Sequence, residues 1–205
     1  MFFTFMRGVV RVVLFILNGR THLVGKDRLP ENQNYILVAP HRTWWEPLHL
    51  AVAGSPKKFS FMAKKELFKN PILSFILKHA NAFPVDREKP GPSAIKTPIK
   101  TLKDTELSLI MFPSGTRHSS ELKGGVALIA KLAKVPIVPS VYQGPLKFKD
   151  LLKRKRVTVA FGDPIDISDI KKMDKDGIAE VERRMNEAFA ALDQEVDPSF
   201  KYEAQ

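Results

Sequence analysis

Residues 40–47 bring a histidine and a carboxylate close together in the sequence, in the segment Pro-His-Arg-Thr-Trp-Trp-Glu-Pro. A histidine accepts a proton best when an acid holds its other ring nitrogen, because this fixes the tautomer and stabilises the imidazolium that forms. His41 and Glu46 are the candidates for such a pair. On a regular helix, residues five apart point about 140° away from each other, so the pairing requires a turn. The prolines at both ends of the segment favour that turn.

A second group of polar residues lies in the segment 112–119, Phe-Pro-Ser-Gly-Thr-Arg-His-Ser. Its glycine permits a tight turn, and two hydroxyl groups and the guanidinium of Arg117 follow closely. Such a loop can hold a phosphate, to which the arginine donates two hydrogen bonds. Arg87 follows another apolar run and supplies a second cation, either for the same ligand or for a neighbouring acid on the surface.

The elements that must position these residues alternate along the chain. Short apolar runs predict strands at 34–39, 58–63, 82–85, 107–112, 136–142 and 157–161. Helical spacing between them predicts helices at 46–53, 70–78, 124–133 and 178–192. The segment 93–102 also has helical spacing, but Pro98 interrupts the pattern. We therefore expect one α/β domain with a mixed, largely parallel sheet flanked by helices. Ligands of such sheets bind beyond the carboxyl ends of the strands, where the polar segments would meet.

The composition excludes several classes of protein and several kinds of site. The 205 residues suit one domain, and 44% hydrophobic with 27% charged residues excludes a disordered or fibrous chain. The absence of Cys excludes a disulfide scaffold, a thiolate-bound metal and a cysteine nucleophile. The histidines lack metal-ligand spacing, so we expect neither a metal nor a cofactor. A net charge of +11 predicts an anionic partner: a nucleic acid, an anionic lipid surface or an acidic carrier molecule.

The first eighteen residues are mostly large and apolar, with a thin polar stripe formed by Thr4, Arg7, Arg11 and Asn18. Two arginines within the run disfavour a spanning helix, and their position disfavours a secretory signal. We predict a membrane-associating amphipathic helix over 1–20, lying in the bilayer interface, followed by the main domain over 21–205. The alternative is a helix that covers the domain's own core. Residues from about 197 onward are expected to be a frayed tail.

Four segments, taken in order, resemble the conserved blocks of the glycerolipid acyltransferases. The family's first block is a histidine, four residues and an aspartate, which His41 to Glu46 matches with glutamate in place of aspartate. The second is similar to 83–87, which ends in Arg87. The third, usually Phe-Pro-Glu-Gly-Thr-Arg-Ser, resembles 112–118, and the fourth resembles the proline-containing strand at 135–139.

This resemblance covers about residues 35–140 and implies a reaction. The expected activity is transfer of a fatty acyl group from an acyl thioester to the sn-2 hydroxyl of 1-acyl-glycerol-3-phosphate, giving phosphatidic acid. It implies catalysis by His41 and Glu46 and acceptor binding by Arg87 and a loop that comprises Ser114, Gly115, Thr116 and Arg117. Ser114 replaces the family's glutamate, which leaves the acceptor's identity open.

The partners implied are a lysophospholipid acceptor, an acyl-CoA or acyl-carrier protein donor and an anionic membrane surface, with the chain on its cytoplasmic face. Lysines and arginines in 147–156 suit either donor. Two alternatives stay open: acyl transfer to another lipid acceptor, and a basic nucleic-acid-binding module. The second lacks aromatic residues interleaved with the basic run, so we expect no nucleic acid partner.

Overall fold

A computed structural model describes residues 2–86, 89, 91–114 and 124–202. Its strands are β1 (His22–Val24), β2 (Ile36–Val38), β3 (Lys58–Lys64), β4 (Ala82–Val85), β5 (Leu107–Met111), β6 (Ile137–Gln143) and β7 (Thr158–Phe161). Its helices are α1 (Phe2–Asn18), α2 (Glu46–Ala53), α3 (Pro71–His79), α4 (Ser93–Asp104), α5 (Gly125–Ala133), α6 (Phe148–Leu151) and α7 (Lys175–Val196), with short 3₁₀ turns η1 (Lys26–Arg28) and η2 (Lys65–Lys69).

The strands of the described chain form one sheet in the order β1-β7-β6-β2-β5-β3-β4. Neighbours are parallel except β6 and β7, which are antiparallel. The predicted α/β class with a mixed, largely parallel sheet is therefore confirmed. The sheet also contains β1, a three-residue strand at its edge that the apolar pattern did not predict.

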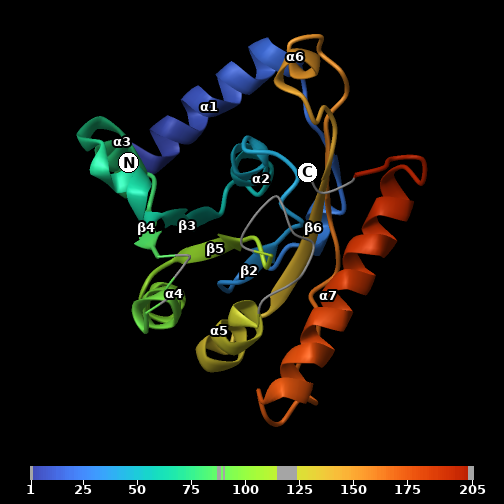
Figure 1. The fold of residues 1–205 in the computed structure, drawn as a ribbon. Coiled ribbons are helices and arrows are strands. Elements are labelled where there is room, and N and C mark those ends of the chain that lie inside the picture. The colour runs from blue at the N-terminus through green and yellow to red at the C-terminus, as the bar shows by residue number, and fades with distance from the viewer. Residues whose placement is uncertain (1, 87–88, 90, 115–123, 203–205) are drawn as a thin grey trace.

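Helices cover both faces of the sheet (Figure 1). On one face, Ile36 and Val38 of β2 pack in a core with residues of α4, α5 and α7. On the other face, Leu37 belongs to a core with residues of α2 and the strand β7. Because a central parallel strand is buried on both sides, its sequence is continuously apolar rather than alternating. This explains why the run at 34–39 was recognisable.

The helix α4 spans Pro98 without interruption. Ala94, Pro98 and Leu102 are all buried, and their spacing of four places them on one face of the helix. A proline in a helix interior removes one backbone hydrogen bond. Burial of this apolar stripe against the core outweighs that loss, which is why the helix continues through the proline.

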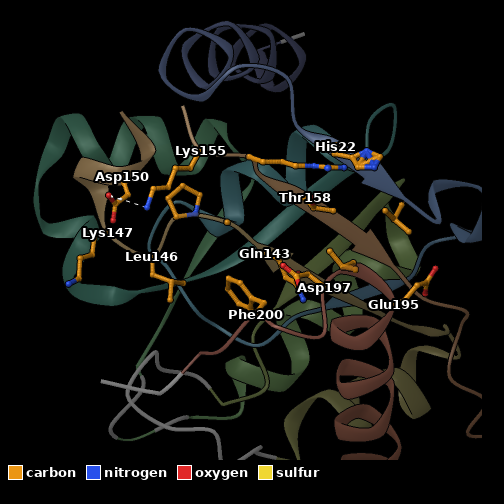
Figure 2. Close-up of a pocket in the computed structure, with 15 residues that line it drawn as sticks. His22, Gln143, Leu146, Lys147, Asp150, Lys155, Thr158, Glu195, Asp197 and Phe200 are labelled. Carbon is orange, nitrogen blue, oxygen red and sulfur yellow. Dashed lines mark ion pairs between the residues drawn. The ribbon is translucent and has the colours of Figure 1, made fainter. Parts of the chain in front are cut away.

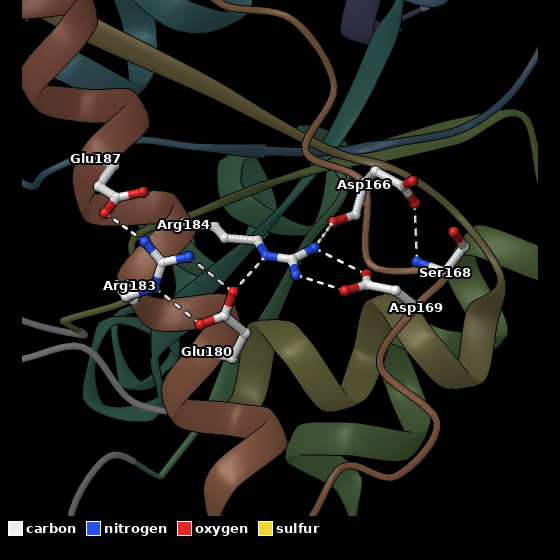
Figure 3. Close-up of polar contacts among 7 residues, drawn as sticks. All are labelled: Asp166, Ser168, Asp169, Glu180, Arg183, Arg184 and Glu187. Atoms are coloured by element: carbon white, nitrogen blue, oxygen red, sulfur yellow. Dashed lines mark hydrogen bonds and ion pairs between the residues drawn. The ribbon is translucent and has the colours of Figure 1, made fainter.

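The long helix α7 is tied to the loop that follows β7 by a network of charged side chains (Figure 3). The Arg184 guanidinium donates two hydrogen bonds to Asp169, at 2.9 and 2.6 Å, and one to the carbonyl oxygen of Asp166 at 2.6 Å. Its Nε donates to Glu180, which also accepts from Arg183. Exposed pairs of this kind contribute little to stability, because water and salt screen them. Their main effect is to fix the loop on the helix, and both arginines are consequently engaged within the fold.

The parallel strands bring the polar segments to one edge of the sheet. β2 and β5 are neighbours with Val38 beside Met111, so the loops that follow them start side by side. β4 runs in the same direction two strands beyond β5, and its end carries Asp86 to the same edge. The starts of these three loops line one cavity, through His41, Asp86 and Phe112.

Candidate active site

His41 and Glu46 lie next to each other in the turn between β2 and α2. The His41 Nδ1 atom is 3.6 Å from the Glu46 Oε2 atom. Residues 41–45 are not helical, and α2 begins at Glu46, so the pair meets across the turn that the prolines favour. The separation exceeds that of a hydrogen bond, so the contact between the two groups is electrostatic. Since Nδ1 faces the acid, Nε2 is the nitrogen left to accept a proton.

Burial disfavours the negative charge of Glu46, whereas its hydrogen-bond partners favour that charge. The side chain is fully buried, and this burial raises the pKa of the Glu46 carboxyl above its ordinary value. The neighbouring His41 and the backbone N–H of Arg42 oppose that rise. Oε2 accepts the Arg42 N–H at 2.6 Å and the Thr43 N–H at 3.3 Å. The carboxylate is thus held in one orientation, with its contact to the imidazole preserved.

The His41 ring stacks on Phe112, the first residue after β5, with ring centroids 4.1 Å apart and planes inclined by 24°. Both residues line a cavity of about 360 Å³ between the strand ends and the helices α4 and α5. Its walls are mainly apolar and include Met62, Ile95 and Ile129. Only 12% of the His41 side chain is exposed. His41 therefore lines a mainly apolar cavity, which suits a molecule with a hydrocarbon chain.

The structure places only some of the predicted acceptor residues. Ser114 is buried in the loop after β5, two residues beyond Phe112. Asp86, which precedes Arg87, lines the same cavity as His41. Four predicted binding residues lie outside the described residues: Arg87, Gly115, Thr116 and Arg117. Within the described ranges, no group of three or more His, Asp or Glu side chains is arranged to hold a metal ion.

A larger depression of about 690 Å³ opens elsewhere, beside α6 and the end of α7 (Figure 2). Lys147, Lys155 and Gln143 line it, and Phe200 forms part of its wall. Neither His41 nor Glu46 lines it, so we assign the candidate active site to the smaller cavity.

His49 is a buried histidine on α2 that the sequence analysis did not assign to the site. Its Nδ1 lies 3.3 Å from the Thr21 hydroxyl oxygen, and its ring lies 5.4 Å from that of Tyr142. Burial lowers the pKa of His49 to about 4. The His49 imidazole is therefore neutral in the folded protein at neutral pH.

This shift predicts a pH-dependent stability. Between pH 6.5 and about 4 the unfolded chain binds one more proton at His49 than the folded chain. The free energy of unfolding should therefore fall as the pH is lowered through that window, by up to about 3 kcal/mol. The His49→Gln variant should lose this part of the pH dependence. Urea unfolding of both proteins at pH 7 and pH 4.5 measures it, and an equal loss of stability in the two would contradict the assignment.

The family model named Acyltransferase matches residues 20–143. A 1-acyl-sn-glycerol-3-phosphate acyltransferase of Streptococcus pneumoniae is 55% identical over 196 residues, covering 95% of this chain and 74% of the relative. The enzyme of the same name from Bacillus subtilis is 39% identical over 188 residues, covering 90% and 94%.

The fold also has a counterpart among solved structures. The crystal structure of the 1-acyl-sn-glycerophosphate (LPA) acyltransferase PlsC from Thermotoga maritima is similar, with a TM-score of 0.71. The match covers 96% of this chain and 80% of that one at 18% identity, so it shows the fold alone. The family model and the two bacterial relatives carry the assignment further: the chain belongs to the acyltransferase family.

Proposed function

We propose that this chain transfers an acyl group from an acyl thioester to the sn-2 hydroxyl of 1-acyl-glycerol-3-phosphate, giving phosphatidic acid. The observation that carries the proposal is that His41, which lies against the buried Glu46, lines the apolar cavity. The names of the two bacterial relatives support the choice of acceptor.

In the proposed reaction, His41 Nε2 takes the proton of the acceptor hydroxyl as its oxygen attacks the thioester carbonyl carbon. The carbon–sulfur bond then breaks, and the leaving thiolate takes the proton back from the imidazolium. Glu46 stabilises the imidazolium between these steps. The apolar cavity would accommodate an acyl chain, whose burial contributes about 0.8 kcal/mol per methylene.

Acceptor binding is proposed for the residues that the family resemblance implies. Arg87 and Arg117 would bind the phosphate, and Ser114, Gly115 and Thr116 would shape the loop. Ser114 brings a neutral hydroxyl where the family has a carboxylate, which removes a negative charge from the neighbourhood of a phosphate. Positioning the acceptor hydroxyl beside His41 supplies part of the lowering of the barrier.

The test is to incubate the purified protein with vesicles that contain lysophosphatidic acid and to add either acyl-CoA or acyl-carrier protein. Mass spectrometry of the lipids then identifies the product. Phosphatidic acid formation with either donor supports the proposal, and comparison of the two rates identifies the preferred donor. Acylation of other lysophospholipids but not of lysophosphatidic acid would contradict it.

We also propose that α1 lies in the bilayer interface, on the cytoplasmic face. Its outward side is apolar: Phe5, Val12 and Ile16 are between 57% and 66% exposed. The Arg7 guanidinium instead donates inward, to the carbonyl oxygens of Pro56 and Lys57 at 3.1 and 2.6 Å. A helix that only covered the core would place its apolar side inward. The described helices include none that could cross a bilayer.

We propose that α1, α3 and α6 share one membrane-facing surface. In Figure 1, α1 runs from the side of α3 towards α6. Ile72 and Phe75 of α3 are 73% and 56% exposed, and Phe148 of α6 is 46% exposed. The anionic cytoplasmic leaflet would attract a chain of net charge +11.

Acidic residues on the outward side of α1 should release the protein from membranes. Val12→Asp with Ile16→Asp is expected to lower binding to vesicles of phosphatidylglycerol and phosphatidylethanolamine at least tenfold, because both positions lose apolar burial and gain a charge. Vesicle flotation measures the bound fraction. The control, Asn186→Asp with Gln194→Glu, makes the same charge change at exposed positions of α7 and should bind normally. Equal binding by both double variants would contradict the proposed role of α1.

A further inference from the structure

Arg42, the residue directly after His41, points into the protein and is almost fully buried. Its guanidinium donates to the Tyr142 carbonyl oxygen at 2.8 Å and forms a two-pronged ion pair with Asp193 of α7. Gln143 supports the acid, donating to Asp193 Oδ1 at 2.9 Å and to its carbonyl oxygen at 3.0 Å. A buried guanidinium requires such partners. The turn that carries His41 is thereby connected to the last turns of α7.

Residues 197–202, which we expected to fray, return to the same arginine. Asp197 Oδ1 accepts the backbone N–H and the hydroxyl of Ser199, at 2.9 and 2.6 Å, and the Phe200 N–H donates to the Asp197 carbonyl oxygen at 3.1 Å. These local hydrogen bonds reverse the chain direction. Figure 2 shows Asp197 and Phe200 close to Gln143.

The reversed segment places two aromatic rings over the guanidinium. The Arg42 Cζ atom is 5.3 Å from the ring centroid of Phe200 and 5.8 Å from that of Tyr202, both within the range of a cation–π contact. The Tyr202 hydroxyl donates to the backbone carbonyl oxygen of His41 at 3.4 Å. Asp193, Phe200 and Tyr202 therefore surround Arg42, and we call these four residues the Arg42 cluster.

We propose that the Arg42 cluster positions the catalytic turn, so that the carboxyl-terminal segment is a positioning element for His41 and Glu46. The link is direct, since the Arg42 backbone N–H donates to Glu46 Oε2 at 2.6 Å, the same oxygen that faces His41 Nδ1. Displacement of the guanidinium would move this N–H and with it the acid. A misplacement of about 1 Å in a catalytic arrangement can reduce the rate about a hundredfold. The part of this inference that concerns turnover rests on the proposed function.

The test compares three variants of the tail in the acyl transfer assay. Phe200→Leu keeps an apolar side chain but removes the ring, whereas Phe200→Tyr keeps the ring. Lys201→Ala changes the exposed neighbour and is the control. We expect kcat of Phe200→Leu to fall at least tenfold while KM for lysophosphatidic acid changes less than threefold. Phe200→Tyr should keep at least half of the wild-type kcat, and Lys201→Ala should match wild type.

A second measurement does not depend on turnover. Hydrogen exchange of the Arg42 and Thr43 backbone amides, both of which donate to Glu46, should become at least tenfold faster in Phe200→Leu and stay unchanged in Lys201→Ala. If the wild-type protein forms no phosphatidic acid but exchange is still faster in Phe200→Leu, the positioning role is supported and the proposed function is rejected. Asp193→Asn, which weakens the ion pair, should also speed this exchange and lower kcat.

Three outcomes would overturn the inference. Wild-type kcat and exchange in Phe200→Leu would mean that the ring does not hold the turn. Equal loss in Phe200→Leu and Phe200→Tyr would indicate packing rather than a ring over the guanidinium. A rise in KM at constant kcat would place Phe200 in acceptor binding instead.

Discussion

Replacement of His41 by alanine is expected to abolish acyl transfer, with kcat lowered about a thousandfold or more. His41 is the proton acceptor in the proposed reaction, and general base catalysis by a positioned side chain contributes about 10²–10⁴-fold. Its Nδ1 faces Glu46 and its ring stacks on Phe112, so the imidazole is held in one orientation for this role. Initial rates with lysophosphatidic acid and an acyl thioester measure the loss.

The control for this variant is another histidine of the same chain. His79→Ala replaces an exposed imidazole on α3, outside the His41 cavity, and should retain wild-type kcat. Circular dichroism and thermal unfolding establish whether His41→Ala is folded. Turnover by folded His41→Ala within tenfold of wild type would reject His41 as the base.

The sequence predicted most of the fold because the central strands are buried on both faces. An apolar run is the direct consequence of such burial: it is unbroken in β2, and a buried serine interrupts it in β5 (Ser108) and in β6 (Ser140). The short edge strand β1 has no such run: His22 is exposed and its neighbours are half-buried. Three partly buried residues are too few to form a recognisable apolar run. β1 is paired to β7, 136 residues later in the register, by backbone hydrogen bonds that carry no sequence signal.

The candidate site was predictable where its residues are close in sequence. His41 and Glu46 share one turn, and the adjacency of β2 and β5 follows from the general behaviour of parallel sheets. The contact of Arg42 with Asp193 could not be inferred, since 151 residues separate them and each is unremarkable in its own segment. The return of the tail has a weak local signal, an aspartate followed by a serine two residues later, which favours a turn. Nothing in that signal indicates where the turn leads.

Substitution of Glu46 by glutamine is expected to lower kcat about a hundredfold to a thousandfold. The amide has nearly the shape of the carboxylate, but its N–H₂ group can donate to His41 Nδ1. The imidazole proton would then lie on Nε2, the atom that must accept the substrate proton, and the imidazolium would lose its negative partner. Glu46→Asp keeps the charge and matches the family's usual residue, so it should stay within about tenfold of wild type.

A measurement of stability shows whether the loss of kcat in Glu46→Gln is caused by unfolding. Because burial raises the pKa of Glu46, the folded chain binds more protons than the unfolded chain between the ordinary pKa and the raised one. This carboxyl therefore makes the folded state less stable as the pH rises through that window, and glutamine removes the buried charge. Glu46→Gln should accordingly be at least as resistant to urea as wild type at pH 7.5, while its kcat is low. If instead glutamine and aspartate at position 46 gave equal kcat, the charge of Glu46 would have no part in the reaction, and the carboxylate would serve only to hold the Arg42 and Thr43 amides.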